Sequence, residues 1–308
     1  MSAASPGGAL RRIAFIGIGN MGWPMAARLV GAGFDVVVCD VAAERSARFA
    51  TEVGGEAAAD AATAARGADA VITILPTSKH VGQAIEAMGD ALSPGALLIE
   101  MSSGVPTATR GFAEALTPRG VAMIDAPVSG GVPRARSGEL AIMLGGEAAD
   151  VARADAVLRA MGNNLTHVGG IGAGQAMKAL NNLMGAAGFL IGVEALLIGQ
   201  RFGLDPAQMV DVLNNSTGMN NSTQKKFKQF VLSRRFDAGF GLELMAKDVS
   251  VALEVAKETG TPVPFAALCR EMWASAVGLL GPGMDHTAMA QFSEKLVGET
   301  LGGGNRAS

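Results

Sequence analysis

Lysine and asparagine side chains stand close together near the start of a long uncharged stretch. No charged residue occurs between Lys178 and Glu194, and Asn181 and Asn182 follow the lysine at three and four positions. On a helix these spacings place both amides on the same side as the lysine. Partial burial and a nearby helix N-terminus both lower the pKa of a lysine toward neutrality, where an amine exchanges protons readily. We therefore expect Lys178 to act as a general acid/base, with Asn182 holding a substrate or orienting the amine. A lysine that simply extends to solvent is the alternative.

A second pattern suited to chemistry is a glycine-rich turn near the N-terminus. The turn, Gly17-Ile18-Gly19-Asn20-Met21-Gly22, joins a predicted strand that begins at Ile13 to a predicted helix over 23–30. In such a turn the first glycine permits the tight bend, the second lets a pyrophosphate approach the backbone, and the third lets the helix pack on the strand. The helix N-terminus then favours the phosphates. The alternative is a strand-to-helix turn that binds nothing.

Asp40 ends the next predicted strand, over 34–39, and lies eighteen residues beyond Gly22. A carboxylate at this distance accepts hydrogen bonds from the ribose hydroxyls of NAD and repels the 2′-phosphate of NADP. The sequence thus predicts NAD as the cofactor, with NADP less favoured. Arg45 is near enough in the sequence to soften that preference, but we expect it to be a solvated helix residue.

Strands and helices alternate in the first half of the chain and helices fill the second. Further strands are predicted at 70–75, 96–99, 121–124, 139–144 and 165–168, with helices at 61–66, 79–88, 107–116 and 150–160. This alternation is typical of a doubly wound parallel sheet, whose ligands bind beyond the carboxyl ends of the strands. One helix over 172–202 follows, and later helices are predicted at 206–214, 222–232, 241–258, 264–277 and 287–297.

The predicted fold class is therefore α/β, with an N-terminal doubly wound Rossmann domain over 1–170. An all-α domain over 171–301 is expected to complete the active-site cleft and to mediate oligomerisation, and one long helix joins the two domains. The glycine-rich segment over 302–308 is expected to be a flexible tail.

Composition excludes several functions. A net charge of −3 over 308 residues gives no electrostatic reason to bind nucleic acid or an anionic membrane. The chain has no tyrosine, which excludes a Tyr–Lys proton donor, and two cysteines are too few for a Cys-ligated zinc site, so no metal is predicted. The uncharged run of fifteen residues is shorter than the ~20 that a bilayer-spanning helix needs. The first residues lack the apolar core of a signal peptide. We expect a cytoplasmic enzyme.

Histidine is the other common acid/base, and the chain has three. His80 falls on a peripheral helix of the sheet and His167 on a predicted strand. We expect core or surface roles for these and for His286, which leaves lysine as the proton carrier.

Four motifs make the chain similar to a known family. They are the segments 17–26, 125–131 and 172–182 and the pair Lys247-Asp248, and they follow the family's order from about residue 12 to 297. On these residues the chain resembles the β-hydroxyacid dehydrogenases, which include 3-hydroxyisobutyrate dehydrogenase, tartronate semialdehyde reductase and sulfolactaldehyde reductase.

The resemblance implies a role for each matching residue. Lys178 would be the catalytic acid/base and Asn182 its helper. Ser129, Gly130 and Gly131 would receive the substrate carboxylate, which agrees with the ability of consecutive backbone N–H groups to hold an anion. The implied cofactor contacts are Gly17, Gly19, Asn20, Met21, Gly22, Asp40, Leu75, Pro76, Ser103 and Lys247. Many members have threonine in place of Ser103, which weakens that one contact.

The substrate motifs point in two directions. The segment 214–218 looks most like the 3-hydroxyisobutyrate members, whereas 285–288 looks more like the tartronate semialdehyde members. The predicted activity is NAD-dependent oxidation of a small 3-hydroxy acid, 3-hydroxyisobutyrate first, with reduction of tartronate semialdehyde or sulfolactaldehyde as the alternative. Arg134 and Arg136 follow the substrate turn and are expected at the surface.

A non-catalytic interaction module on the same fold is the alternative of another class. Such a protein would lose Lys178 and gain a basic extension, and the imine reductases on this scaffold usually lack the lysine as well. The presence of Lys178 argues against both.

The long helix also predicts assembly. It is too long and too apolar for the first domain alone to cover, and Gly188, Gly192 and Gly199 would let a helix of a partner chain approach closely. We expect a homodimer or a homotetramer.

Overall fold

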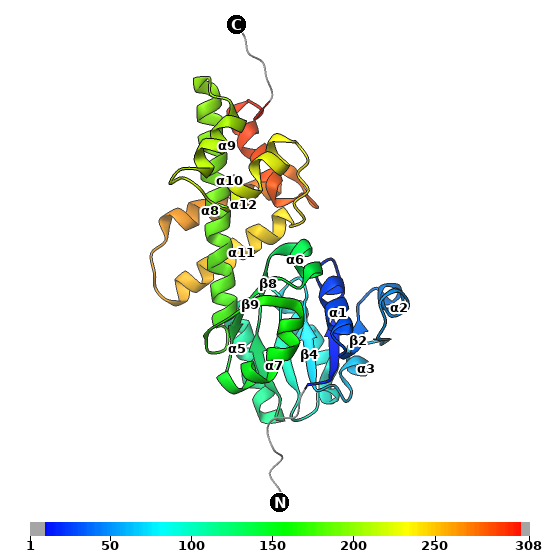
Figure 1. The fold of residues 1–308 in the computed structure, drawn as a ribbon. Coiled ribbons are helices and arrows are strands. Elements are labelled where there is room, and N and C mark those ends of the chain that lie inside the picture. The colour runs from blue at the N-terminus through cyan, green and yellow to red at the C-terminus, as the bar shows by residue number, and fades with distance from the viewer. Residues whose placement is uncertain (1–9, 303–308) are drawn as a thin grey trace, which may run out of the picture. The chain divides into compact units, whose positions relative to one another are not determined.

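The computed structural model describes residues 10–302, and divides the chain into two compact units that meet in sequence at Lys178 and Ala179. The predicted tail, apart from Gly302, and most of the segment considered for a signal peptide lie outside the described residues. Figure 1 gives the element labels used below. Each unit is described by itself.

The first unit is built on a sheet whose nine described strands follow the order β3-β2-β1-β4-β5-β6-β8-β7, with β9 paired to β8. The strands are β1 (Arg12–Ile16), β2 (Asp35–Cys39), β3 (Glu56–Ala57), β4 (Ala70–Thr73), β5 (Leu97–Glu100), β6 (Ala122–Asp125), β7 (Val128–Ser129), β8 (Leu140–Gly145) and β9 (Gly162–Gly169). Strands β1 to β6 are parallel, but β8 runs antiparallel to β6 and β7, so the sheet is mixed where we predicted a parallel one. The doubly wound core is confirmed.

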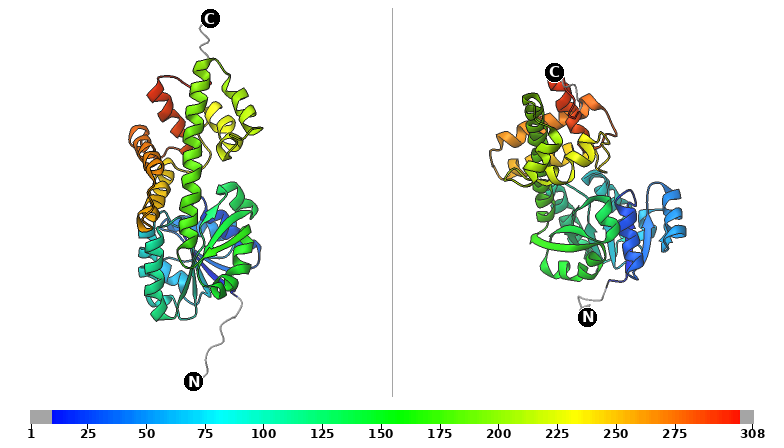
Figure 2. Two further views of the ribbon diagram at one scale, coloured as in Figure 1. Left: turned by 90° about the vertical axis from the view of Figure 1, so that its left-hand side faces the viewer. Right: turned by 45° about the horizontal axis from the view of Figure 1, so that its top comes forward.

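Helices cover both faces of this sheet, as the alternation of buried residues along the strands requires. Ile13 and Phe15 of β1 join one apolar cluster with α1 (Gly22–Gly31), α2 (Ala43–Glu52), α6 (Gly131–Ser137) and α7 (Ala148–Met161). Ala14 and Ile16 join another with α3 (Ala61–Ala65), α4 (Ser78–Met88) and α5 (Pro106–Leu116). Short 3-10 turns lie at Gly89–Ala91 (η1) and Thr117–Arg119 (η2). The left view of Figure 2 shows the strands between the two helix layers.

Besides the 3-10 turns, the short elements β3, β7 and α6 were not predicted. Both residues of β3 are exposed and β7 is only partly buried, so neither has an apolar pattern. Helix α6 is seven residues long, with a proline and two arginines and a single buried side chain. Strands this short form by pairing with neighbouring strands, and a helix this short forms by packing on its neighbours. A local sequence pattern reveals neither.

Helix α8 (Ala173–Phe202) is one continuous helix of 30 residues, as predicted, and is the long green helix in Figures 1 and 2. The other helices of the second unit are α9 (Pro206–Asn214), α10 (Asn221–Lys225), η3 (Phe227–Leu232), α11 (Leu242–Glu258), α12 (Pro264–Leu280), η4 (His286–Ala288) and α13 (Met289–Val297). The single helix predicted at 222–232 is in fact α10 followed by a π-helical turn, because the backbone leaves helical geometry at Lys226.

The core of the second unit forms around the C-terminal two thirds of α8. Phe189 packs against both Phe227 and Trp273, with ring centroids 5.4 and 6.2 Å apart. Among the described residues, α8 is the one helix that is long and apolar enough to cross a membrane, with a mean hydropathy of 1.7, but half of that window is buried in the protein. A core helix passes the same test, and the apolar cluster around Phe189 and Val193 accounts for this helix.

The glycines of α8 that we expected to admit a partner chain pack against residues of the same chain. A Cβ atom placed on Gly192 would lie 2.5 Å from the Phe227 ring, and one on Gly199 would overlap Met209. Gly188 similarly faces Asn220, whose side-chain amide donates to its carbonyl oxygen at 3.3 Å. These glycines admit elements of the same chain because a helix can approach closely only where side chains are absent.

We predict opposite effects for two glycine substitutions on α8. Gly192→Ala should destabilise the second unit by about 1–3 kcal/mol, because Phe227 must shift. Gly185→Ala meets nothing within 4 Å and should stabilise it by about 0.5–1 kcal/mol through helix propensity. Unfolding in urea, followed by Trp273 fluorescence in a Trp23→Phe background, measures both. Equal effects of the two substitutions would contradict the assigned packing.

Candidate active site

The glycine turn has the shape that dinucleotide binding needs. Gly17 has φ +94°, and a Cβ on it would lie 2.5 Å from the carbonyl oxygen of Ile74. A Cβ on Gly22 would overlap the carbonyl oxygen of Gly17, so the start of α1 is packed directly on the turn. At Gly19, by contrast, a Cβ would meet no heavy atom within 4 Å. The backbone is thus tight at both ends and open in the middle, which fits a pyrophosphate that approaches Gly19, Asn20 and Met21.

Asp40 follows β2 and is held by three donors. Its Oδ2 accepts from the Ile18 N–H at 2.9 Å, and its Oδ1 accepts from the Ala42 N–H at 3.0 Å and from Arg45 at 2.9 Å. The Asp40 side chain is 6% exposed and that of Arg45 is 43% exposed. Arg45 is on α2, but it is an ion-pair partner of Asp40 rather than the merely solvated residue we expected. Its charge offsets the repulsion that Asp40 exerts on a 2′-phosphate.

A cavity of about 640 Å³ lies beside this part of the turn. Its lining includes Gly19 and Asn20 of the turn and the charged residues Arg28, Arg45, Arg48, Glu52 and Arg136. Arg48 also stacks on the Trp23 ring, 4.6 Å from its centroid. The lining of this cavity therefore carries a net positive charge, which the sequence pattern did not show.

The loops after β4 and β5 are joined by serine side chains. The Ser102 Oγ accepts from the Leu75 N–H at 2.9 Å, and the Ser78 Oγ accepts from the Val105 N–H at 2.8 Å. These contacts bring the predicted cofactor segments, Leu75-Pro76 and Ser103, to the same edge of the sheet. Both follow carboxyl ends of parallel strands, where such sheets bind ligands.

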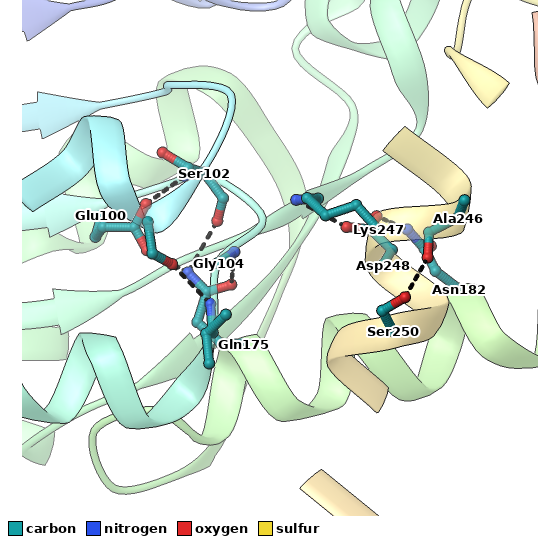
Figure 3. A network of polar contacts seen from close by, with 11 residues as sticks. Glu100, Ser102, Gly104, Gln175, Asn182, Ala246, Lys247, Asp248 and Ser250 are labelled. Atoms are coloured by element: carbon teal, nitrogen blue, oxygen red, sulfur yellow. Dashed lines mark hydrogen bonds and ion pairs between the residues drawn. The ribbon is translucent and has the colours of Figure 1, made fainter. Parts of the chain in front are cut away.

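Gln175 lies in a buried polar network with the end of β5 (Figure 3). Its Nε2 donates to Glu100 Oε2 and, at 2.8 Å, to the carbonyl oxygen of Ser102. Its Oε1 accepts from the Gly104 N–H at 2.7 Å, and Glu100 Oε1 accepts from the Ser102 N–H at 2.8 Å. Sequence reasoning assigned no role to Gln175 or Glu100, although a glutamine in the first turn of an apolar helix is a signal that was available.

Asp125, the last residue of β6, holds the beginning of α8. Its two oxygens accept from the N–H groups of Gly172 and Gln175, both at 2.7 Å. Gly174 allows this contact, since a Cβ there would overlap the carbonyl oxygen of Met143. Lys178 is the sixth residue of α8 and lies three positions after Gln175. The predicted acid/base is thus placed by a helix turn bonded to the carboxyl ends of β5 and β6.

Burial governs the ionisation of the two carboxyl groups. Removal from water raises the pKa of Glu100 to about 7, against the opposing effect of its donors Ser102 and Gln175. Burial likewise raises the pKa of Asp125, while the N–H groups of Gly172 and Gln175 lower it. These hydrogen-bond donors therefore replace water as partners of the two carboxyl groups, and they stabilise the charged forms in a buried environment.

The predicted substrate turn lies between β7 and α6. Ser129 ends β7, and Gly130 and Gly131 have φ of +135° and +67°, conformations that L side chains rarely adopt. A Cβ on Gly130 would in addition lie 2.6 Å from Arg134 Cδ. Arg134 and Arg136 are exposed on α6, where we expected them.

In the second unit, Asp248 of α11 connects two predicted site residues (Figure 3). Its Oδ2 accepts from Asn182 Nδ2 at 2.5 Å, and its Oδ1 lies 2.9 Å from Lys247 Nζ. Asp248 is only 1% exposed. In the sequence, Asp248 was recognised as part of the motif Lys247-Asp248, but no role was assigned to it. An acidic residue next to a lysine was the available signal of a role.

Each of the three histidines contacts neighbouring protein groups. His80 bonds the Thr77 hydroxyl, His167 lies in β9 and contacts the carbonyl oxygens of Gly146 and Gly169, and His286 is buried beside Phe240. These are the core and surface positions that we expected.

Comparison with known proteins places both halves of the chain. The family model described as the NAD binding domain of 6-phosphogluconate dehydrogenase matches residues 12–169. The model described as NAD-binding of NADP-dependent 3-hydroxyisobutyrate dehydrogenase matches residues 172–293.

Individual relatives agree with these models. The 3-hydroxyisobutyrate dehydrogenase of Pseudomonas aeruginosa is 38% identical over 275 residues, which cover 85% of this chain and 91% of the relative. The NAD-dependent L-serine dehydrogenase of the same organism is 36% identical and covers 86% and 91%. The structure of Mycobacterium tuberculosis 3-hydroxyisobutyrate dehydrogenase with L-serine has a TM-score of 0.84 and 32% identity, covering 92% of this chain and 98% of that one. The chain therefore belongs to the β-hydroxyacid dehydrogenase family, and it is an NAD(P)-binding oxidoreductase.

Proposed function

We propose that the protein oxidises 3-hydroxyisobutyrate, or a 3-hydroxy acid of similar size, to the semialdehyde with NAD. The observation that carries this proposal is the placement of Lys178 on a helix turn that Asp125 and Gln175 bond to the strand ends. Those strand ends also lead into the cofactor loops and the substrate turn.

Lys178 serves as the general base in this reaction. Its neutral amine takes the proton of the substrate hydroxyl as the carbinol C–H bond breaks, and it returns a proton in the reverse direction. A bound nicotinamide supplies the hydride acceptor.

The carboxylate of the substrate is assigned to the turn of Ser129, Gly130 and Gly131. Successive N–H groups and the serine hydroxyl offer donors to an anion without a charged side chain. By the family match, Asn182 assists at the substrate and Lys247 contacts the cofactor. The contacts of Asp248 with both side chains support a defined orientation for each.

L-Serine is the second candidate substrate. It is also a small 3-hydroxy acid, and it appears in the names of one relative and one related structure. Tartronate semialdehyde and sulfolactaldehyde are the reductive alternatives. We propose a cytoplasmic enzyme with a small carboxylate substrate and with neither a nucleic acid nor a membrane partner.

Removal of the lysine tests the proposal directly. Lys178→Ala should lower kcat by about 10²–10⁴-fold, as expected for loss of a general acid/base, while NAD still binds. Nicotinamide absorbance with a panel of 3-hydroxyisobutyrate, L-serine and the two semialdehydes measures turnover, and quenching of Trp23 fluorescence measures NAD binding. The exposed Lys79→Ala is the matched control. A variant that keeps most of its turnover would remove Lys178 from the mechanism.

Cofactor choice depends on the balance between Asp40 and Arg45. We expect NAD to be preferred over NADP in kcat/KM. Asp40→Asn should narrow the preference because a negative charge is lost, whereas Arg45→Ala should widen it because the charge of Asp40 is no longer offset. Arg159→Ala, on the exposed face of α7, is the control. A native preference for NADP, or the same direction of change in both variants, would contradict the prediction.

We also propose that the protein forms a homodimer or a homotetramer. The support is now an apolar stripe along α8, made of Met184, Ile191, Ile198 and Phe202, which are 54–84% exposed. A stripe of this length is unusual on the surface of a monomer.

Light scattering at micromolar concentration should give a multiple of 31.2 kDa. Substitution of both Ile191 and Ile198 by glutamate should shift the mass toward the monomer, since buried charges oppose association. Leu296→Glu, at an exposed site on α13, should have no such effect. A native mass of 31.2 kDa would leave the protein a monomer.

A further inference from the structure

Gln175 has more polar contacts than its position in an apolar helix requires. Its side chain is 1% exposed. The carboxamide donates to Glu100 and to the Ser102 carbonyl oxygen, and it accepts from the Gly104 N–H. Its backbone N–H donates to Asp125. Both the N–H₂ group and the carbonyl oxygen of the Gln175 amide thus form hydrogen bonds with the segment 100–104.

These contacts join the helix that bears Lys178 to the loops that carry predicted cofactor contacts. Ser102, which accepts from the Leu75 N–H through its hydroxyl, gives its carbonyl oxygen to Gln175. Gly104, on the other side, follows Ser103 directly. The path from Leu75 through Ser102 and Gln175 to α8 therefore uses hydrogen bonds inside one unit. Ser102, Gly104 and Gln175 are at the left of Figure 3.

The chemistry of the side chain explains why glutamine suits this position. An ionised glutamate could not donate to Glu100 or to the Ser102 carbonyl oxygen, and an apolar residue would remove the Gln175 donor from the buried carboxyl group of Glu100. An amide alone both donates and accepts here. Lys178 lies three positions later on the helix, so a small rotation or shift of the first turn moves its amine.

We propose that Gln175 is the positioning residue for Lys178, holding it in register with the cofactor loops after β4 and β5. The inference rests on the proposed role of Lys178 as acid/base. In this proposal Gln175, which is 1% exposed, acts through the helix and not by contact with substrate or cofactor.

The first test is Gln175→Met, which removes the amide at nearly constant volume. We expect kcat to fall about 10–100-fold, because a misplacement of about 1 Å costs that much, with KM for NAD within about threefold of native. The control is Gln200→Met on the same helix. Gln200 also makes three side-chain hydrogen bonds, to residues 299, 300 and 302, and its loss should leave kcat within about twofold.

A double-mutant cycle separates positioning from a general structural role. If Gln175 acts through Lys178, Gln175→Met should lower the residual kcat of Lys178→Ala by less than about threefold. Effects that multiply in the two backgrounds would overturn the inference while leaving the proposed function intact. Native turnover in Lys178→Ala would overturn both.

A third test exchanges the side chains of residues 100 and 175, so that the conclusion does not depend on one variant that could fail to fold. Glu100→Gln and Gln175→Glu, each alone, place two amides or two carboxylates in contact. The two together restore one carboxylate and one amide, and kcat of the pair should exceed that of either single variant by at least about fivefold. Recovery should be partial, because a carboxylate at position 175 cannot donate to the Ser102 carbonyl oxygen. A folded pair with a kcat no higher than that of either single variant would show that the contact between residues 100 and 175 does not position the lysine.

Discussion

The contact between Asp125 and the first turn of α8 is the constraint on which the site depends. A carboxylate at the end of a buried strand is costly unless donors replace water, and the N–H groups of Gly172 and Gln175 are free to do so because a helix start has no internal acceptors for them. The same contact places negative charge at the positive end of the helix. This one contact therefore gives the Asp125 carboxylate its hydrogen-bond donors, caps the N-terminus of α8 and fixes the position of the helix turn before Lys178. Gly174 is the steric condition for it, since any side chain there would strike β8.

Around this contact the first unit arranges its polar groups in series along the carboxyl edge of the sheet. Asp40 holds the glycine turn through the Ile18 N–H, Ser102 holds the loop after β4, and Gln175 holds the segment after β5. Each of these side chains is buried or nearly so, and each accepts or donates at 2.7–2.9 Å to a backbone group. Such bonds fix the loops more firmly than surface ion pairs would, because solvent does not compete for them.

The second unit follows different physics. Its stability comes from aromatic and aliphatic packing around α8, where Phe227 and Met209 occupy the space left by Gly192 and Gly199. Its buried polar contacts include the pair of Arg234 with Glu294 and the group of Asn182, Lys247 and Asp248, in which the Asp248 side chain is 1% exposed. A buried carboxylate that keeps both a lysine and an amide in place is expensive for folding, which is consistent with a functional rather than a stabilising role.

The sequence by itself determined the fold class and most of the elements, since strong periodic patterns and the glycine turn depend on residues that are close along the chain. It also identified Lys178, Asp40 and the substrate turn as candidates, because family motifs and helix spacing are local. Only the tertiary structure decided which partners these residues have. The network of Gln175 with Glu100 and the packing of Phe227 on Gly192 join segments that are far apart in the sequence, and no local pattern links them. The strand β8 was predicted, but its antiparallel direction and the two-residue strands β3 and β7 were missed, because pairing with neighbouring strands decides both.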